Sequence, residues 1–185
     1  NMFKIKGVIY IDNRRVGKFN KRVKRYKLFF CSKRVSLFLK DIGVPVGNKT
    51  NVNFLVPSWI FNGTPKIQGS YLKGLFDAEG SIFYIKNCNR WQISLKLAKN
   101  KNMIKQCVRY MNPLRIMLNR LGVKSSPVRN RFLNVRKDGS ISHIFQFDIE
   151  KGSFRNFYKH IGFDHPLKRK KLKSALSKSG DLKKP

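Results

Sequence analysis

The strongest constraint on the fold is a repeat of two short segments at a constant spacing. FLKDIGV at residues 38–44 matches FYKHIGF at residues 157–163, and RYKLFF at 25–30 matches IFQFDI at 144–149. Both pairs lie 119 positions apart, with no gap between their strand-like and helix-like parts. Helices often end in glycine, so convergence explains one match, whereas two matches in register favour duplication. The sequence therefore predicts two copies of a strand, turn, strand and helix.

Hydrophobic periodicity and turn residues extend this plan along the chain. In the first copy we expect strands at 3–12 and 25–31, a basic loop at 13–24, and a helix capped by Ser32 that ends at Gly43. A second helix is expected to begin at Ser70 and end at Gly80. Further strands are expected at 81–86, 91–98, 128–135 and 141–149, and helices at 102–121, kinked by Pro113, and at 153–161.

This element order predicts an α+β protein with unequal copies. Residues 1–65 form a partial, ββα first copy, and residues 66–167 form a complete αββαββα copy. Residues 168–185 are expected to be a basic C-terminal helix or tail.

The charge of the chain indicates its class of partner. Its 185 residues include 41 lysines and arginines against 9 acids, so the formal net charge is +32. Self-repulsion on this scale opposes compaction, whereas a phosphate backbone turns the same charge into binding free energy. The 41% hydrophobic residues still suffice for a core. We therefore expect nucleic acid as the partner.

Several other classes are excluded. No stretch approaches the roughly 18 apolar residues of a membrane span, and the first residues lack a signal-peptide core. The interpretation is a soluble, intracellular protein, cytoplasmic or organellar, without a membrane partner. Cys31, Cys88 and Cys107 are widely spaced and form no CxxC pair, so reduced, half-buried thiols are expected rather than zinc ligands or disulfides.

The short helix LKGLFDAEG at residues 72–80 holds two of the nine acids. Gly74 and Ala78 are one turn apart and form a small-residue face that another helix could approach. Glu79 falls at the helix C-terminus, where the helix dipole repels a carboxylate. A divalent cation bound by oxygen ligands would hold it. On spacing alone, the simpler alternative is that Asp77 and Glu79 pair with neighbouring cations.

This segment resembles the LAGLIDADG motif of homing endonucleases in its leucines, Gly74, Asp77, Ala78 and Gly80, with Glu79 replacing the second Asp. VPSWI before the motif and GSIFYI after it also resemble the monomeric, two-repeat members, and the resemblance covers essentially the whole chain. It implies αββαββα halves whose motif helices pack at a pseudo-twofold axis. The antiparallel sheet of each half would form a saddle in the DNA major groove.

The resemblance also implies roles for individual residues. In the family, the final acid of each motif binds a divalent metal, and two such acids cut the two strands. Glu79 matches this acid, so it would be catalytic and a ligand of Mg²⁺, whereas Asp77 matches the acid that orders the helix ends. Lys99 is the nearest match to an assisting lysine, although Ala98 stands where a polar residue is usual.

Residues 1–65 contain no first motif, so the second metal-binding acid is missing. Three alternatives remain open: a fragment whose upstream part exists elsewhere, a lineage that has lost its nuclease centre, and a homodimer formed through the single motif helix.

Cations and aromatics alternate along the predicted strands, and denser basic runs occupy 14–24 and 168–173. Alternation would direct one set of side chains to the core and the other to a bound duplex, while the basic runs would clamp phosphates. The expected nucleic-acid contacts are Lys4, Lys6, Arg14, Arg15, Arg22, Arg25, Lys27, Lys86, Arg90, Trp91, Lys96, Arg129, Arg131, Arg136, Lys168, Arg169, Lys170 and Lys171.

Both parts of the chain are basic, with 15 cations against 2 acids in residues 1–66 and 26 against 7 in residues 67–185. This spread favours a binder of structured intron or ribosomal RNA without an intact nuclease centre, bound to the ribosome beside ribosomal proteins. The alternative is a site-specific double-strand DNA homing endonuclease with Mg²⁺ as cofactor, seen without its N-terminal motif.

Overall fold

The computed structural model describes residues 7–16, 21–29, 31–47, 51–135, 139 and 141–178. The chain divides into two compact units, residues 1–44 and 45–185. The first unit contains β1 (Val8–Val16), β2 (Lys21–Phe29) and α1 (Lys33–Asp41). The expected start of the second repeat at residue 66 lies inside the second unit, and the division by repeats stays a prediction.

The hairpin of the first unit is longer than expected. Backbone pairing runs from Val8↔Phe29 to Val16↔Lys21, so most of the basic segment expected as a loop at 13–24 is strand. Alternating apolar residues did not mark this extension, because cations occupy most of its positions. The helix that follows is confirmed: the Ser32 hydroxyl accepts a hydrogen bond from the backbone N–H of Val35 at 3.3 Å.

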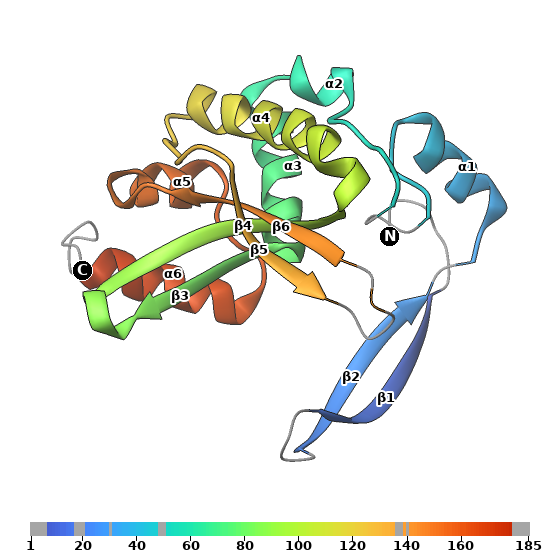
Figure 1. Cartoon of the computed structure of the whole chain (residues 1–185), viewed down its shortest axis with the longest axis horizontal. Helices are drawn as coiled ribbons and strands as arrows, with labels where there is room; N and C mark the ends of the chain where they lie inside the picture. Colours follow the sequence, from blue (N-terminus) through green and yellow to red (C-terminus); the bar gives the residue numbers. More distant parts are fainter. Residues whose placement is uncertain are drawn as a thin grey trace. The chain divides into compact units, whose positions relative to one another are not determined.

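The second unit is an antiparallel sheet with helices packed against it (Figure 1). The strands are β3 (Gly80–Ile85), β4 (Arg90–Asn100), β5 (Arg129–Val135) and β6 (Ile141–Ile149), in the order β3-β4-β6-β5. The helices are α2 (Ser58–Phe61), α3 (Pro65–Ala78), α4 (Ile104–Arg120), α5 (Phe154–His160) and α6 (Pro166–Lys178). The expected α+β class with antiparallel pairing is confirmed.

The same element order occurs in both units. The last residues of β1, β2 and α1 lie 119, 120 and 119 positions before the last residues of β5, β6 and α5. The spacing of 119 found in the sequence therefore joins two strand, strand and helix segments of nearly equal bounds, as the duplication predicts.

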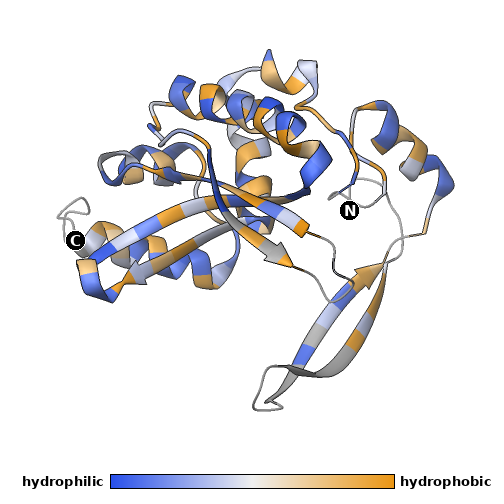
Figure 2. Ribbon diagram, viewed as in Figure 1, coloured by the Kyte–Doolittle hydropathy of each residue, from blue (hydrophilic) through white to orange (hydrophobic). Residues whose placement is uncertain are grey.

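The two faces of the sheet differ in chemistry. On β4, Ile93, Leu95 and Leu97 are buried in the core, together with Phe145 and Phe147 of β6, against α3, α4 and α5. The alternate residues of β4 point to the opposite face because successive strand side chains alternate. Figure 2 shows apolar and polar residues alternating along these strands. This second, polar face is called the outer face below.

Two helix predictions are corrected by the structure, one at the start of α3 and one in the middle of α4. α3 begins at Pro65 rather than after Ser70, with the Thr64 hydroxyl accepting from the N–H of Ile67 at 3.4 Å. Proline at the first helical position and a Thr cap are both favoured, and Ser70 lies inside the helix. α4 is continuous through Pro113. Its side chains Leu114 and Met117 are fully buried, and this packing offsets the lost backbone bond.

The basic C-terminal segment is a packed helix up to Lys178. α6 buries Leu172, Ala175 and Leu176 in the core. These three residues are spaced as one helical face, although cations surround them in the sequence. Residues 179–185 of the expected tail lie outside the described residues.

Among the described residues, no helix combines the length and apolar character needed to cross a membrane.

Candidate nucleic-acid interface

The C-terminus of the motif helix α3 and the N-terminus of α6 satisfy each other's backbone groups. The Asp77 carboxylate accepts from the N–H of Asp164 at 2.9 Å and of His165 at 3.1 Å. In return, the Lys168 ammonium donates to the carbonyls of Phe76, Asp77 and Gly80 at 3.1, 2.6 and 2.7 Å. A carboxylate at a helix N-terminus and a cation at a C-terminus are each favourable. We call this Asp77–Lys168 arrangement the helix clasp.

The clasp changes the interpretation of two predicted residues. The Asp77 carboxylate bonds the backbone at the start of α6, and its expected role of ordering helix ends stays a prediction. The Lys168 ammonium donates to three carbonyls, so the phosphate contact expected of it would require these bonds to open, and it also stays a prediction. Burial lowers the pKa of Lys168, partly offset by the charges of Asp77 and Glu79.

Glu79 is the C-cap residue of α3 and is half-buried beside a pair of tyrosines. The hydroxyls of Tyr71 and Tyr110 lie 2.9 Å apart. Burial raises the pKa of Tyr110 above its usual range, and the charge of Glu79 raises it further. Burial also raises the pKa of Tyr71, partly offset by its bond to Tyr110. Both phenols therefore remain neutral next to the Glu79 carboxylate at physiological pH.

Lys99 is buried beside Phe54. It is 2% exposed, and its ammonium donates to the carbonyl of Val52 at 2.7 Å and lies 3.9 Å from the centre of the Phe54 ring. The ring centres of Phe54 and Tyr110 are 4.6 Å apart, so Lys99 adjoins the aromatic cluster that contains Tyr110. Lys99 holds the segment that precedes α2 in this structure, and its expected catalytic role stays a prediction.

Over the residues that the structure describes, no group of three or more His, Cys, Asp or Glu could hold a metal ion. Both oxygens of Asp77 accept backbone N–H bonds, so this carboxylate holds the α6 backbone in this structure. A magnesium site at Glu79 would need oxygen ligands from another motif helix.

One face of α3 is open. A Cβ placed on Gly74 would meet no heavy atom within 4 Å, and Ala78, one turn further, is exposed. By contrast, a Cβ on Gly80 would come within 2.6 Å of the Phe76 carbonyl oxygen. The predicted small-residue face is thus uncovered by the described residues, whereas Gly80 is required by the turn into β3.

The outer face of the sheet carries a polar network centred on Asp148. Its Oδ1 accepts from the Ser94 hydroxyl at 2.7 Å and from the amides of Gln92 and Gln146 at 2.9 and 2.5 Å. Arg131 approaches its Oδ2 at 3.9 Å. Burial raises the pKa of Asp148, but these hydrogen bonds and the Arg131 charge together lower it below its ordinary value. Asp148 is therefore ionised at neutral pH.

Sequence reasoning missed this network. Its signal was the polar residues at alternate positions, 92 and 94 on one strand and 146 and 148 on another, which pair as Ser94↔Asp148 and Lys96↔Gln146. The pairing of β4 with β6 could not be deduced from the sequence, because β5 precedes β6 in the chain.

Predicted contacts surround the network. Arg129 and Arg131 of β5 are exposed, and exposed Lys96 lies 5.9 Å from the centre of the Phe83 ring. Lys86 and Arg90 are exposed at the β3–β4 turn, where half-buried Trp91 packs against Tyr84 at 5.4 Å.

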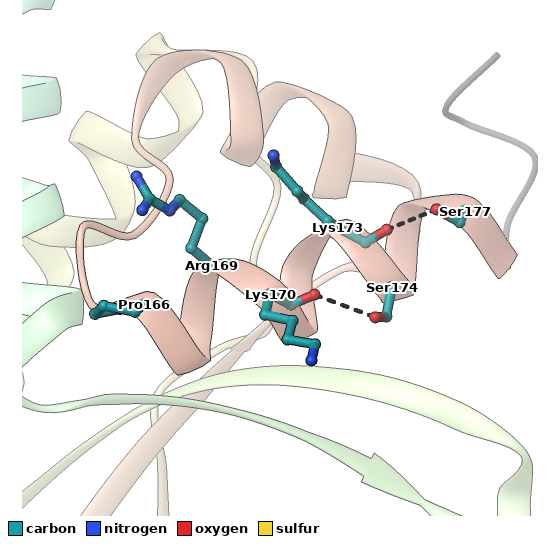
Figure 3. A pocket seen from close by; sticks show the side chains of 6 residues that line it. All are labelled: Pro166, Arg169, Lys170, Lys173, Ser174 and Ser177. Carbon is teal, nitrogen blue, oxygen red and sulfur yellow. Dashed lines mark hydrogen bonds between the residues drawn. The ribbon is translucent and has the colours of Figure 1, made fainter. Parts of the chain in front are cut away.

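A second cationic surface lies on α6. Figure 3 shows Arg169, Lys170 and Lys173 along a shallow groove, with Ser174 and Ser177 bonded to the carbonyls of Lys170 and Lys173. Arg169 and Lys170 are exposed, whereas the ammonium of Lys171 donates to the Ile82 carbonyl at 3.4 Å. Arg169 and Lys170 are therefore the stronger candidates on this helix for phosphate contact.

Lys27 is exposed on β2. The remaining predicted contacts lie outside the described residues, or on strands whose side chains there are not described: Lys4, Lys6, Arg14, Arg15, Arg22, Arg25 and Arg136.

The three cysteines were expected to be half-buried, but their exposure in the structure differs. Cys31 and Cys88 are exposed and reduced, and Cys107 is buried. Burial raises the pKa of Cys107 to about 11, partly offset by Lys99.

Comparison with known proteins finds segments similar to this chain in several proteins that are named for different functions. The chain is 26% identical over 139 residues to tRNA-splicing ligase RtcB of Methanocaldococcus jannaschii, covering 75% of this chain and 14% of the ligase. In the same organism, DNA-directed RNA polymerase subunit Rpo1N is 26% identical over 80% of this chain and 11% of the subunit. Glutamine–fructose-6-phosphate aminotransferase of that organism is 31% identical over 136 residues, which cover 73% of this chain and 11% of the aminotransferase.

The chain thus spans about one seventh of the ligase and one ninth of the other two proteins. No family model and no solved structure matches it.

Proposed function

We propose that this chain is a LAGLIDADG-type nucleic-acid-binding unit that recognises duplex DNA through the outer face of its sheet. The observation that carries the proposal is the chemistry of that face. Gln92, Lys96, Arg129 and Arg131 are polar or cationic and line it opposite the packed helices. Amide and guanidinium groups are the side chains that read base edges in a major groove.

The motif helix supports the same proposal. The motif LKGLFDAEG ends in Glu79 and Gly80, its small-residue face is open at Gly74, and the ββα order of residues 8–41 repeats that of residues 129–160. Each of these features is what the family resemblance implies for a half that packs against a second motif helix. Cleavage would then require that second helix, because among the described residues no group of three or more His, Cys, Asp or Glu could hold a metal ion.

The different functions for which the similar proteins are named also favour a unit that has an activity of its own. Similar segments occur in a protein named as a tRNA-splicing ligase, in one named as an RNA polymerase subunit and in one named as an aminotransferase. One segment of this size cannot supply three such different activities. A small part common to such different proteins is better explained by an activity of its own. An intein- or intron-type endonuclease is such a unit.

A second candidate is a binder of structured RNA without nuclease activity. Exposed cations on α6, away from the outer face, and the match to proteins named tRNA-splicing ligase favour it. The deep, narrow major groove of an RNA helix cannot be read by side chains, so the amide network of the outer face would then contact base edges in loops, in bulges or across the shallow minor groove.

Binding to a 30-base-pair duplex and to an RNA hairpin of equal charge, each measured by fluorescence anisotropy over a salt series, tests the proposal. We expect the duplex to bind, with a log–log slope of about −0.9 per phosphate contacted. A flat salt dependence, or binding to the hairpin alone, would reject duplex recognition, and the latter result would favour the RNA binder.

A further inference from the structure

The outer face contains polar side chains that are buried, which is unusual for a sheet face that points away from the core. Ser94 is fully buried and Gln146 is 5% exposed, although both lie on the face opposite the core. Buried polar groups are costly unless every one is hydrogen-bonded, and a fully bonded network holds its members rigidly. The unusual feature is that one carboxylate, Asp148, satisfies most of these groups.

Asp148 commits the donors of both glutamines. The Gln92 amide nitrogen donates to Asp148 Oδ1 at 2.9 Å and to Ser94 Oγ at 3.1 Å. The Gln146 amide nitrogen donates to the same two atoms at 2.5 and 3.4 Å. The amide nitrogens of both glutamines therefore point into the network, and the carbonyl oxygen is the end of each amide that is turned toward another partner.

Arg131 is held at the edge of the same network. Its guanidinium lies 3.9 Å from Asp148 Oδ2, and its side chain is 39% exposed against 22% for Asp148. The pairing of β5 with β6 shifts register between Asn130 and Phe132, so Arg131 occupies a bulge. Bulges often redirect a side chain next to a functional site. A guanidinium has five N–H donors, and a single approach to Asp148 leaves most of them available to a ligand.

We propose that Asp148 is a positioning residue for base recognition, which presets Gln92 as a hydrogen-bond acceptor and Arg131 as a donor on the outer face. The inference rests on the proposed duplex recognition and adds its specificity. A free glutamine pairs with adenine as donor and acceptor together. Gln92 held by Asp148 offers only an acceptor, which matches the amino group of cytosine or adenine. Arg131 matches the acceptors of a neighbouring guanine.

The charge of Asp148 makes this proposal separable from general affinity. A carboxylate on a phosphate-binding face lowers attraction to any duplex. Asp148→Asn removes that charge, leaves one neutral carbonyl oxygen as a weaker acceptor for Gln92, Ser94 and Gln146, and places N–H donors where the Arg131 guanidinium meets Oδ2. The variant should therefore bind random-sequence duplex as tightly as the wild type or more tightly, while losing its base preference.

The test is selection from a pool of random-sequence 30-base-pair duplexes, followed by anisotropy on the enriched and scrambled sequences. For wild type we expect an enriched motif with preference for C or A beside G. Asp148→Asn should reduce the preference at those positions by about 5- to 100-fold, the range that one base contact confers. Gln92→Leu, at a half-exposed position, tests the same reading without removing the carboxylate and should lose only the C or A preference.

Lys170→Ala on α6 is the matched control: it should leave the ratio of the affinities for the enriched and scrambled duplexes unchanged, because a cation away from the outer face reads no base edge. If Asp148→Asn and Gln92→Leu fold, as judged by cooperative melting, and keep the wild-type preference, the positioning role is overturned while duplex recognition stands. A wild-type protein that enriches no sequence overturns both proposals.

Discussion

At the residue scale, two glycines of one motif have opposite structural roles. Gly80 lies where a Cβ would be 2.6 Å from the Phe76 carbonyl oxygen, and Gly74 lies where a Cβ would meet nothing. Gly80 and Gly74 were both visible in the sequence as part of the motif. Only the structure shows that a Cβ at Gly80 would meet the backbone of Phe76 and that Gly74 leaves a helix face open.

Gly80→Ala should lower the free energy of unfolding by about 1–3 kcal/mol, because backbone atoms of α3 would have to move. Gly74→Ala is the matched control and should raise it by about 0.5–1 kcal/mol, since alanine favours a helix interior. Urea unfolding of both variants checks the pair. Equal effects at the two sites would contradict the close approach at Gly80.

Asp148 should make stability depend on acid pH. Its carboxylate is hydrogen-bonded in the folded protein, so its folded pKa lies below the unfolded value near 3.8. The stabilisation is thus present above about pH 4 and is lost as the pH falls through the folded pKa. Asp148→Asn should be less stable than wild type by about 1–3 kcal/mol at pH 7.

That difference should shrink below about pH 4, as followed by urea unfolding at several pH values. A difference that stays constant down to about pH 2.5 would show that hydrogen bonding to the charged form is not its source.

At the scale of elements, the sequence located most helices and strands but not their partners. Strand periodicity marked β3, β4, β5 and β6, and the spacing of 119 linked the two strand, strand and helix segments. The order β3-β4-β6-β5 and the helix clasp both join residues far apart in the chain. Lysine-rich α6 was ambiguous because long cationic side chains surround its three buried residues.

The clasp should contribute measurably to the docking of α6. Lys168→Met keeps the length of the side chain but leaves the carbonyls of Phe76, Asp77 and Gly80 without their donor. We expect a loss of about 1–3 kcal/mol in the free energy of unfolding, the cost of unsatisfied partly buried groups. Lys170→Met, exposed on the same helix, should change it by less than about 0.5 kcal/mol. Chemical denaturation of both variants provides the measurement, and equal losses would contradict the clasp.

At the scale of the whole molecule, the formal charge of +32 indicates a polyanion but not a surface. In the second unit, polar and cationic side chains occupy alternate positions of neighbouring strands and so share the outer face of the sheet. The cations of α4 and α6 lie on helices and are not part of that face. The spread of cations over both parts of the sequence favoured RNA, whereas the structure places a patterned set of them on one face of the sheet. The central claim is that the outer face, rather than charge in general, binds the duplex.

Two double charge reversals test that claim most directly. Lys96→Glu with Arg129→Glu changes the outer face, and Lys105→Glu with Arg109→Glu makes the same change in net charge on exposed positions of α4. Anisotropy with one 30-base-pair duplex at fixed salt compares their affinities, and a salt series compares their slopes. We predict that the outer-face variant binds at least about tenfold more weakly than the α4 variant, with a salt slope that is shallower by about 0.9 for each phosphate it no longer neutralises. Equal affinities, or weaker binding by the α4 variant, would contradict duplex recognition by the outer face.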